Sequence, residues 1–224
     1  MQEPGFRVLP RDCRPLSSET IQKFRSVATA HISDNLHRAS GILGLNPYHR
    51  PSPLAGRALT VKTRAGDNLM IHKAMTMLQP DDVLVVDGYG DTSNALVGEL
   101  MKLTAESRGC VGFIINGAIR DVAAYRSSTF PCYAKGVTHR GPYKEGPGEV
   151  NVPVAIGGTV INPGDLVVGD EDGLVVLPPD DASRVLELAN ALHRKEEEIR
   201  LAIASRKLDV SWIDAVLKAK GIVS

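Results

Sequence analysis

The stretch 109–121, which reads GCVGFIINGAIRD, organises the fold of this 224-residue chain. Its first half is a continuous apolar run with β-branched and aromatic side chains, which predicts a strand covered on both faces. The Asn-Gly pair at 116–117 predicts the end of that strand, and 122–126 predicts a short helix. The sequence therefore places Arg120 and Asp121 just past a buried strand, where open α/β sheets bind their ligands.

The Arg120-Asp121 pair has two interpretations. A guanidinium can bind an anionic substrate through two parallel hydrogen bonds, and a carboxylate can bind a hard cation. The same side chains could instead cap a helix and form surface ion pairs, which is the more frequent role of such a pair taken alone. The residues around a second strand end favour the functional interpretation.

A second predicted strand, 83–86 (VLVV), ends in the glycine-containing turn 87–91. A helix predicted from residue 95 onward leads to the strand at 109–115, so the two strands should be parallel neighbours that share a crevice. Gly98 lies inside this helix pattern, where it costs about 1 kcal/mol relative to alanine. Either the helix is broken there or another group packs tightly against it. A helix that opens at 98–101 would offer free N–H groups to an anion.

Composition excludes several classes of function. With 26 basic and 26 acidic residues the formal net charge is zero, so no overall field would attract nucleic acid or a membrane surface. No apolar run approaches the roughly 20 residues needed to span a bilayer, and the N-terminus lacks the apolar core of a signal peptide. We therefore expect a cytoplasmic protein with neither nucleic acid nor a membrane as partner. The three cysteines, Cys13, Cys110 and Cys132, do not predict a disulfide framework.

The remaining segments predict a β-rich second half between helical ends. Residues 17–28 predict a helix, and 30–36 either continues it or begins another. Further helices are predicted at 69–77, 180–204 and 211–217, and strands at 57–64, 130–137, 150–156, 159–161, 166–168 and 174–177. The glycine- and proline-rich loop 139–149 suits a moving or subunit-bridging role. The helix at 211–217, with the single tryptophan Trp212, should dock on the body or on a neighbouring subunit.

Two groups of polar residues resemble metal sites but have simpler explanations. His31 and His37 flank Asp34, yet residues six apart do not share a helical face, so a metal site there is disfavoured. The acidic run 170–172 resembles a calcium loop but lacks the closing glutamate, so turn chemistry explains it better.

Three motifs in order resemble the RraA-like family, which includes the 4-hydroxy-4-methyl-2-oxoglutarate aldolases and related oxaloacetate decarboxylases. They are GYGDTSNALVGELM at 88–101, NGAIRD at 116–121 and PGDLVVGDEDGLVVLP at 163–178. The resemblance covers about residues 20–200. It implies a single α/β domain, an α/β/β/α sandwich of the swivelling, phosphohistidine-domain-like type. We expect an extended arm at 1–16, the catalytic domain at 17–204 and a helical tail at 205–224.

The resemblance also implies a cofactor, an assembly and site residues. Mg²⁺ or Mn²⁺ would be the cofactor, and a homotrimer or a hexamer made of two trimers would hold its active sites at subunit interfaces. The family's metal-associated aspartate falls on Asp121 and its substrate-binding, catalytic arginine on Arg120. The amides that hold the pyruvyl carboxylate fall on Leu100 and Met101, after Gly98.

Two sets of glutamates complete the expected site. Glu99 stands where many members of the family have aspartate; it keeps the charge but reaches about one methylene further. The resemblance implies that this carboxylate orients a metal-bound water. A metal-linked water or hydroxide near Glu99 is the candidate base, so Glu99 is expected to be the second catalytic residue. The family's aldolases also borrow a glutamate from the C-terminal helix of the next subunit. Glu196, Glu197 and Glu198 are the candidates in this chain.

These residues predict a divalent-metal lyase, a class II pyruvate aldolase. Its small oxo-acid substrate would be 4-hydroxy-4-methyl-2-oxoglutarate or a related 4-hydroxy-2-oxo acid, cleaved to pyruvate, with oxaloacetate decarboxylation as a second activity. The alternative is the role of the family's namesake, a non-catalytic regulator that binds and inhibits ribonuclease E. The intact Arg120-Asp121 pair favours the enzyme. A methyltransferase is disfavoured because no glycine-rich nucleotide loop follows the first strand.

Overall fold

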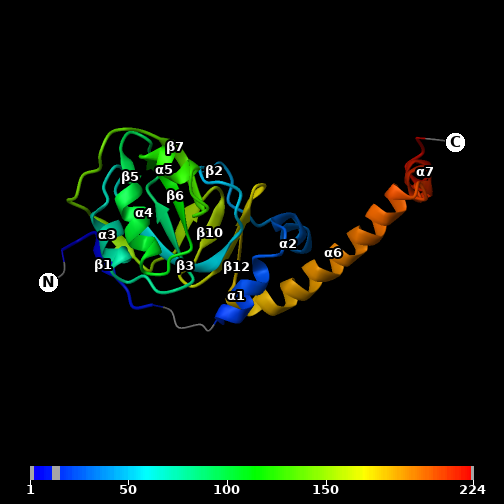
Figure 1. Cartoon of the computed structure of the whole chain (residues 1–224), viewed down its shortest axis with the longest axis horizontal. Helices are drawn as coiled ribbons and strands as arrows, with labels where there is room; N and C mark the ends of the chain where they lie inside the picture. Colours follow the sequence, from blue (N-terminus) through cyan, green and yellow to red (C-terminus); the bar gives the residue numbers. More distant parts are fainter. Residues whose placement is uncertain (1–2, 12–15, 223–224) are drawn as a thin grey trace.

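A mixed sheet forms the centre of the molecule (Figure 1), in a computed structural model that describes residues 3–11 and 16–222. Its strand order is β1-β8-β3-β4-β6-β7-β2, with β5 added beside β6, β11 added beside β3, and β12 added beside β11. The strands are β1 Phe6–Val8, β2 Asn46–Pro47, β3 Leu54–Thr63, β4 Asp82–Asp87, β5 Ala95–Val97, β6 Gly112–Ile119, β7 Cys132–Val137, β8 Gly148–Val150, β11 Leu166–Asp170 and β12 Gly173–Leu177. A separate hairpin consists of β9 Val154–Ile156 and β10 Thr159–Ile161.

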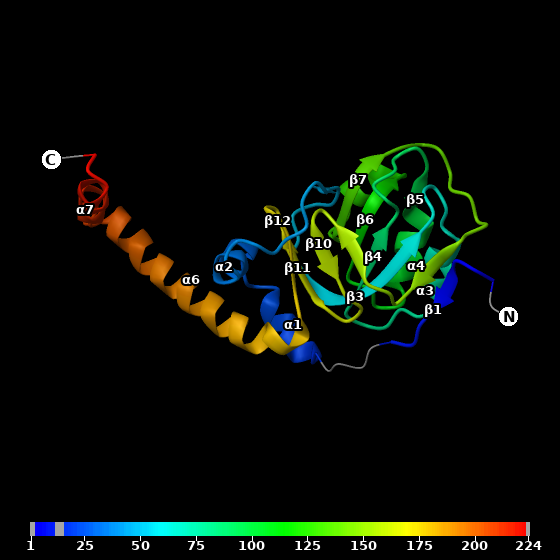
Figure 2. The same ribbon diagram turned by 180° about the vertical axis from the view of Figure 1, so that it is seen from behind.

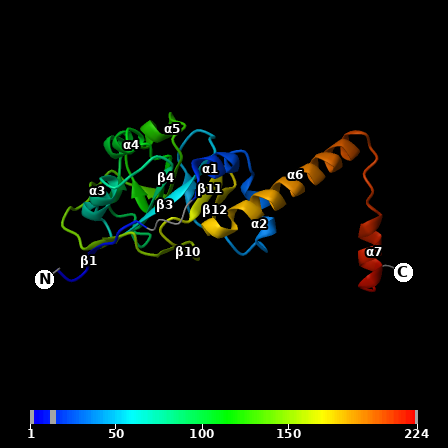
Figure 3. The same ribbon diagram turned by 90° about the horizontal axis from the view of Figure 1, so that it is seen from below.

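The helices gather in three places. They are α1 Ser18–Phe24, α2 Thr29–Asn35, α3 Leu69–Met75, α4 Glu99–Glu106, α5 Val122–Arg126, α6 Ala182–Ala204 and α7 Ser211–Ala219, with a 3₁₀ turn at Pro179–Asp181. α3, α4 and α5 cover one face of the sheet, α1 and α2 pack near β11 and β12, and α6 leads away from the body to α7 (Figures 1 and 3).

The centre of the sheet is parallel, as the βαβ pattern predicts. β4 pairs in parallel with both β3 and β6, and Val86 lies beside Ile115. Alternate residues of β4 face opposite sides. Leu84 and Val86 belong to the core under α3 and α4, whereas Val83 and Val85 pack toward the β9–β10 hairpin on the other face (Figure 2).

A third apolar cluster packs the first part of α6 against the body of the protein. Val175 and Leu177 of β12 pack with α1, α2 and the first part of α6, including Val185 and Ala189. Beyond these contacts α6 extends away from the body (Figure 1). α7 has no buried residue, and Trp212 is 64% exposed. No helix among the described residues is long and apolar enough to cross a membrane.

The prediction that the Asn-Gly pair at 116–117 ends its strand is wrong. β6 continues to Ile119, because Asn116 pairs with Asp87 of β4 and the residues after it pair with β5 and β7. The pair leaves only a shift of register against β7, between Ile115 and Ala118. Arg120 is therefore delivered directly by the end of the strand.

The prediction of a helix beginning at residue 95 is also wrong. Residues 95–97 form β5, which pairs with β6, and Leu96 is fully buried. The Leu96 side chain fills the space left by two glycines: a Cβ on Gly88 or Gly117 would lie 2.6 Å from its Cδ1. Strand pairing and this packing override the helical spacing of the apolar residues. The helix begins at Glu99, as the broken-helix alternative predicts.

Most other elements follow the predicted order, but the strand predicted at 150–156 is divided into β8 and β9, which belong to different sheets. The α/β class and the short helix after the Arg-Asp pair are confirmed, and residues 29–35 form a separate helix. The domain limits at 16, 17, 204 and 205 stay predictions. Residues 1–2 and 12–15 of the predicted arm, including Cys13, lie outside the described residues.

Candidate functional site

A small cavity of about 80 Å³ lies where α4 begins, and we call it the α4 cavity. Leu100 and Met101 line it from α4, and Arg120 and Asp121 line it from the end of β6. β5, Gly98, Asn68 and Pro142 complete the wall. All five predicted substrate- and metal-binding positions therefore line one cavity, namely Gly98, Leu100, Met101, Arg120 and Asp121.

Asp121 holds two segments together. Its backbone has φ 56° and ψ 39°, a left-handed conformation that Asp tolerates better than most residues and that costs other side chains about 1–2 kcal/mol. Asp121 precedes α5, but its side chain does not cap that helix. Its Oδ2 instead accepts a hydrogen bond of 3.0 Å from the N–H of Glu99. The carboxylate therefore sits at the positive end of α4, where negative charge is stabilised.

Gly98 is required by the closeness of its neighbours. Its backbone is extended, with φ −148°, so conformation alone would admit other residues. A Cβ there would lie 2.5 Å from Oδ2 of Asp121 and 3.2 Å from Nε of Arg120. Both explanations predicted for Gly98 hold: the helix begins immediately after it, at Glu99, and side chains pack tightly against it.

A backbone hydrogen bond fixes the position of Arg120, whereas its guanidinium makes no hydrogen bond within the described residues. Its N–H donates to the carbonyl of Val97 at 3.1 Å. Its Nε lies 3.8 Å from Oδ2 of Asp121, and no guanidinium hydrogen bond is found within the described part of the chain. A Cβ on Gly141 would approach one of its terminal nitrogens to 3.2 Å. The guanidinium thus lies between two glycines with its donors available to a ligand.

The first turn of α4 offers two unused amides. The first intrahelical bond of α4 runs from the N–H of Lys102 to the carbonyl of Gly98. The N–H groups of Leu100 and Met101 have no partner among the described residues, as expected at a helix start. Together with Arg120 they make a site for a carboxylate.

Asn68 is a cavity residue that the sequence analysis missed. It is 2% exposed, and its Nδ2 donates to the carbonyl of Leu96 at 3.0 Å, whereas its buried Oδ1 has no partner within the described residues. An unpaired buried acceptor is costly, so a donor from a ligand would satisfy it. The sequence shows Asn68 only as a polar residue before a helix, which carries no such signal.

The loop at 139–149 is anchored by Asp67, which is fully buried. Asp67 Oδ2 accepts hydrogen bonds from the N–H groups of Glu145 at 2.7 Å and Gly146 at 2.9 Å, and its Oδ1 accepts one from Leu69 at the start of α3. Pro142 of this loop lines the α4 cavity. One carboxylate therefore fixes the loop and a helix beside the site.

Tyr125 holds the start of α4 in place through a hydrogen bond. Its hydroxyl donates to the carbonyl of Gly98 at 3.2 Å. Burial raises the pKa of Tyr125 far above its ordinary value, helped by nearby thiol and carboxylate groups. The phenol therefore stays a neutral donor.

The glutamates lie at the edge of the site or far from it. The Glu99 side chain is exposed and does not line the α4 cavity, although its N–H bonds Asp121. Glu196 Oε2 accepts a hydrogen bond of 2.8 Å from Nε2 of His31, which lowers the pKa of Glu196. Glu197 pairs with Arg200 at 2.6 Å. Glu196, Glu197 and Glu198 all belong to α6, which extends away from the body (Figure 1).

A divalent cation that keeps most of its water ligands fits the chemistry of this site. No group of three His, Cys, Asp or Glu side chains suited to a metal is found among the described residues. Mg²⁺ needs no such cage, because it commonly binds through one or two carboxylates and keeps several waters. Oδ1 of Asp121 makes no hydrogen bond within the described chain, and the side chain is 44% exposed.

Comparisons with known proteins identify relatives of this chain. A sequence profile of the RraA-like family, described as Aldolase/RraA, matches residues 29–176. The Halalkalibacterium halodurans protein named "Putative 4-hydroxy-4-methyl-2-oxoglutarate aldolase" is 36% identical over 85% of this chain and 91% of its own length.

Solved structures of RraA proteins share the fold. Streptomyces coelicolor RraAS2, an unusual member of the RNase ES inhibitor RraA family, superposes with a TM-score of 0.75 at 27% identity, over 84% of this chain and 99% of that one. The RNA-processing inhibitor RraA from Thermus thermophilis gives a TM-score of 0.63 at 30% identity, over 68% of this chain and 93% of that one. The profile match, the aldolase relative and the shared α/β fold lead to one conclusion: this chain belongs to the RraA-like family.

Proposed function

We propose that this protein is a divalent-metal-dependent carbon–carbon lyase. It would cleave 4-hydroxy-4-methyl-2-oxoglutarate or a related 4-hydroxy-2-oxo acid to pyruvate, and would also decarboxylate oxaloacetate. The observation that carries the proposal is the convergence of Arg120, Asp121 and the free amides of Leu100 and Met101 on one cavity. The name of the Halalkalibacterium halodurans relative supports the aldolase assignment.

Binding of the substrate's pyruvyl end follows from the free donors. The N–H groups of Leu100 and Met101 would bind the carboxylate at the positive end of α4. The Arg120 guanidinium would bind the oxygen on which negative charge develops as the carbon–carbon bond breaks. Oδ1 of Asn68 would accept the hydrogen bond of a substrate hydroxyl, because it is buried and unpaired among the described residues.

Asp121 is the residue that would hold Mg²⁺ or Mn²⁺, through its free Oδ1. A bound divalent ion supplies positive charge beside the substrate's oxo and carboxylate oxygens. Oδ2 meanwhile stays hydrogen-bonded to the N–H of Glu99, which fixes the orientation of the carboxylate.

Glu99 is the proposed acceptor of the proton that the tertiary alcohol loses during aldol cleavage. It is the first residue of α4, its side chain is exposed, and its neighbours Gly98 and Leu100 line the cavity. Decarboxylation of oxaloacetate requires no such proton removal. The two reactions therefore differ in their need for this carboxylate.

The assembly is part of the proposal. We propose a homotrimer or a hexamer with shared active sites, in a fold of the α/β/β/α swivelling type. The arm formed by α6 leads away from its own α4 cavity (Figure 3), so Glu196, Glu197 or Glu198 could reach such a cavity only in another copy. Glu198 has no ion pair among the described residues, whereas the other two are engaged within the chain.

The test is pyruvate release from both compounds, with Mg²⁺, with Mn²⁺ and with a chelator. Chelator-sensitive release from either compound supports the lyase. Asp121→Asn should keep the hydrogen bond to the Glu99 N–H and the fold, yet lose most turnover and its response to metal. Glu99→Gln should slow aldol cleavage by at least about tenfold and leave decarboxylation nearly unchanged. Equal loss of both reactions would remove Glu99 from the role of base.

The second candidate function is regulation of a ribonuclease. It is supported by the names of the Streptomyces coelicolor and Thermus thermophilis neighbours. A well-folded oligomer that releases no pyruvate under any metal condition, and that retains a ribonuclease E fragment in a pull-down, would replace the lyase with this function.

A further inference from the structure

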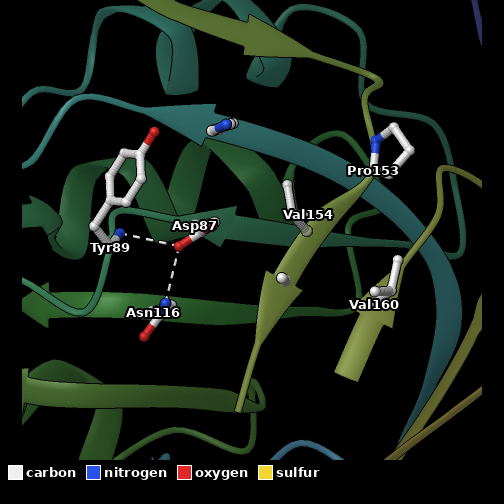
Figure 4. Close-up of a pocket in the computed structure, with 8 residues that line it drawn as sticks. Asp87, Tyr89, Asn116, Pro153, Val154 and Val160 are labelled. Carbon is white, nitrogen blue, oxygen red and sulfur yellow. Dashed lines mark hydrogen bonds between the residues drawn. The ribbon is translucent and has the colours of Figure 1, made fainter. Parts of the chain in front are cut away.

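A second and larger cavity, of about 590 Å³, lies between the ends of the central strands and the β9–β10 hairpin (Figure 4). The hairpin packs on the face of the sheet opposite to α4 (Figure 2). We call it the hairpin cavity, because β9 and β10 form one wall with Val154, Ala155 and Val160. The opposite wall is polar and consists of Lys62, Asp87, Tyr89 and Asn116. No residue of the α4 cavity lines it.

Three of these polar residues form a row across the sheet. Lys62 of β3 pairs with Asp87 of β4, and Asp87 pairs with Asn116 of β6. Adjacent strands are about 4.8 Å apart, so the row spans roughly 10 Å. The spacing suits a small molecule that makes several polar contacts at once.

Asp87 has one oxygen committed and one oxygen free. Its Oδ1 accepts hydrogen bonds of 2.9 Å from the Tyr89 N–H and from Nδ2 of Asn116 (Figure 4). Its Oδ2 makes no hydrogen bond within the described residues, although the residue is only 7% exposed. Oδ1 therefore holds the turn after β4 and the neighbouring strand β6, whereas Oδ2 has no such role. Oδ2 of Asp87 is therefore an acceptor that a ligand donor in the cavity can reach, on a carboxylate that is otherwise largely shielded from water.

Lys62 provides a charge of the opposite sign. No carboxylate lies within 4.0 Å of its ammonium among the described residues, and its Nζ is 5.7 Å from the centre of the Tyr89 ring. Lys62 and Tyr89 also line a neighbouring cavity of about 380 Å³, which contains Arg64. Lys62 is a partly exposed residue, and its ammonium is therefore available to an anion.

We propose that the hairpin cavity is a binding site for a small hydroxylated carboxylic acid. The ligand carboxylate pairs with Lys62, and a ligand hydroxyl donates to Oδ2 of Asp87. The carbon skeleton packs against Val154 and Val160 of the hairpin. A cation alone would leave Lys62 unexplained, and a simple anion would leave Oδ2 of Asp87 without a donor.

The test uses pairs of acids that differ by one hydroxyl: malate against succinate, and citrate against tricarballylate. Binding is measured by calorimetry on the full-length Arg120→Ala protein, so that the α4 cavity contributes little. We expect the hydroxy acids to bind more tightly than their deoxy partners. Lys62→Met, added to Arg120→Ala, should weaken hydroxy-acid binding at least about tenfold, because a charge-assisted hydrogen bond is lost. Lys73→Met is the matched control, since Lys73 is exposed on α3 and lines neither cavity.

Location is checked independently by methyl NMR and by a filling variant. Malate or citrate should shift the methyl signals of Val154 and Val160. Ala155→Trp should block binding while leaving Lys62 and Asp87 in place, which keeps the test valid if Lys62→Met folds poorly. The proposal fails if Lys62→Met and Ala155→Trp both bind like their parent, if succinate binds as well as malate, or if the hairpin methyl signals do not move. None of these readouts depends on catalysis.

Discussion

The α4 cavity and the α6–α7 arm are built in opposite ways. At the α4 cavity, atoms are so close that Gly98 has no room for a Cβ, and Asp121 is held in a left-handed conformation. Along the arm, Leu201 is 70% exposed and Trp212 is 64% exposed. Close packing within one chain fixes the geometry of the α4 cavity. The α6–α7 arm instead exposes apolar side chains that only a contact with another molecule could bury. Small changes should therefore damage the cavity sharply and the arm only weakly in a single chain.

The largest expected effect comes from the guanidinium in the crowded region. Arg120→Ala should lower the rate of pyruvate release by about 10²–10³-fold, because removal of one donor to a developing oxyanion has effects of that size. Its thermal unfolding should match the parent, since the Arg120 side chain makes no hydrogen bond among the described residues. Arg126→Ala, an exposed arginine of α5 with no ion pair in the described chain, is the control and should retain activity. Full activity of Arg120→Ala would show that catalysis does not need the Arg120 guanidinium.

Two glycines around Arg120 give a graded version of the same test. Gly98→Ala places a methyl group 2.5 Å from Oδ2 of Asp121, so the carboxylate must move and turnover should fall by about tenfold or more. Gly141→Ala contacts only the end of the Arg120 side chain, at 3.2 Å, and should cost much less. Steady-state kinetics with both variants measure the difference. If the two variants lose activity equally, close packing at Gly98 is not what positions the site.

The next effect concerns stability beside the cavity. Asp67→Ala removes the acceptor of three N–H groups from Leu69, Glu145 and Gly146. The free energy of unfolding should fall by about 2–3 kcal/mol, because buried donors are left unpaired. Urea unfolding measures it, with Asp34→Ala as control, because Asp34 makes only a surface ion pair with Arg38. A loss no greater than that of the control would mean that the loop at 139–149 does not depend on Asp67.

The smallest effect is expected at the base of the arm. The hydrogen bond from His31 lowers the pKa of Glu196, so its stabilisation is complete above the ordinary glutamate pKa and is lost as the pH falls through the lowered value. Backbone hydrogen exchange in α6, corrected for its intrinsic pH dependence, should therefore become slightly faster at acidic pH. His31→Ala should show this faster exchange at neutral pH and no further change on acidification. An unchanged exchange rate in His31→Ala would show that the α2 contact does not hold the arm.

Local patterns predict much of the fold but miss two strand details. The apolar runs at 83–86 and 109–115 identify the parallel strands because both faces of these strands are buried. The segment 95–97 has the spacing of a helix, and it becomes a strand only because β6 pairs with it and Leu96 packs under two glycines. Such a contact joins distant parts of the chain, so no local pattern contains it.

The candidate site shows the same limit. Arg120, Asp121 and the start of α4 follow from strand ends and from one glycine in a helical pattern. Asn68 precedes α3, and Pro142 lies in the loop at 139–149. These two segments are joined by the hydrogen bonds of Asp67, which are contacts between distant parts of the chain. The hairpin cavity depends on strand register, because Lys62, Asp87 and Asn116 are separated in sequence and adjacent only in the sheet.

The pairing of β1 has a consequence for the order of folding. Phe6 lies beside Gly148, and β8 is itself held by β3, so β1 can join only after the rest of this edge has formed. Closing so long a loop carries a large entropic cost, repaid here by a strand of three residues. We expect β1 to be the last strand to form and the first to detach, and pulse-labelling hydrogen exchange that protects β1 as early as β4 would contradict this order.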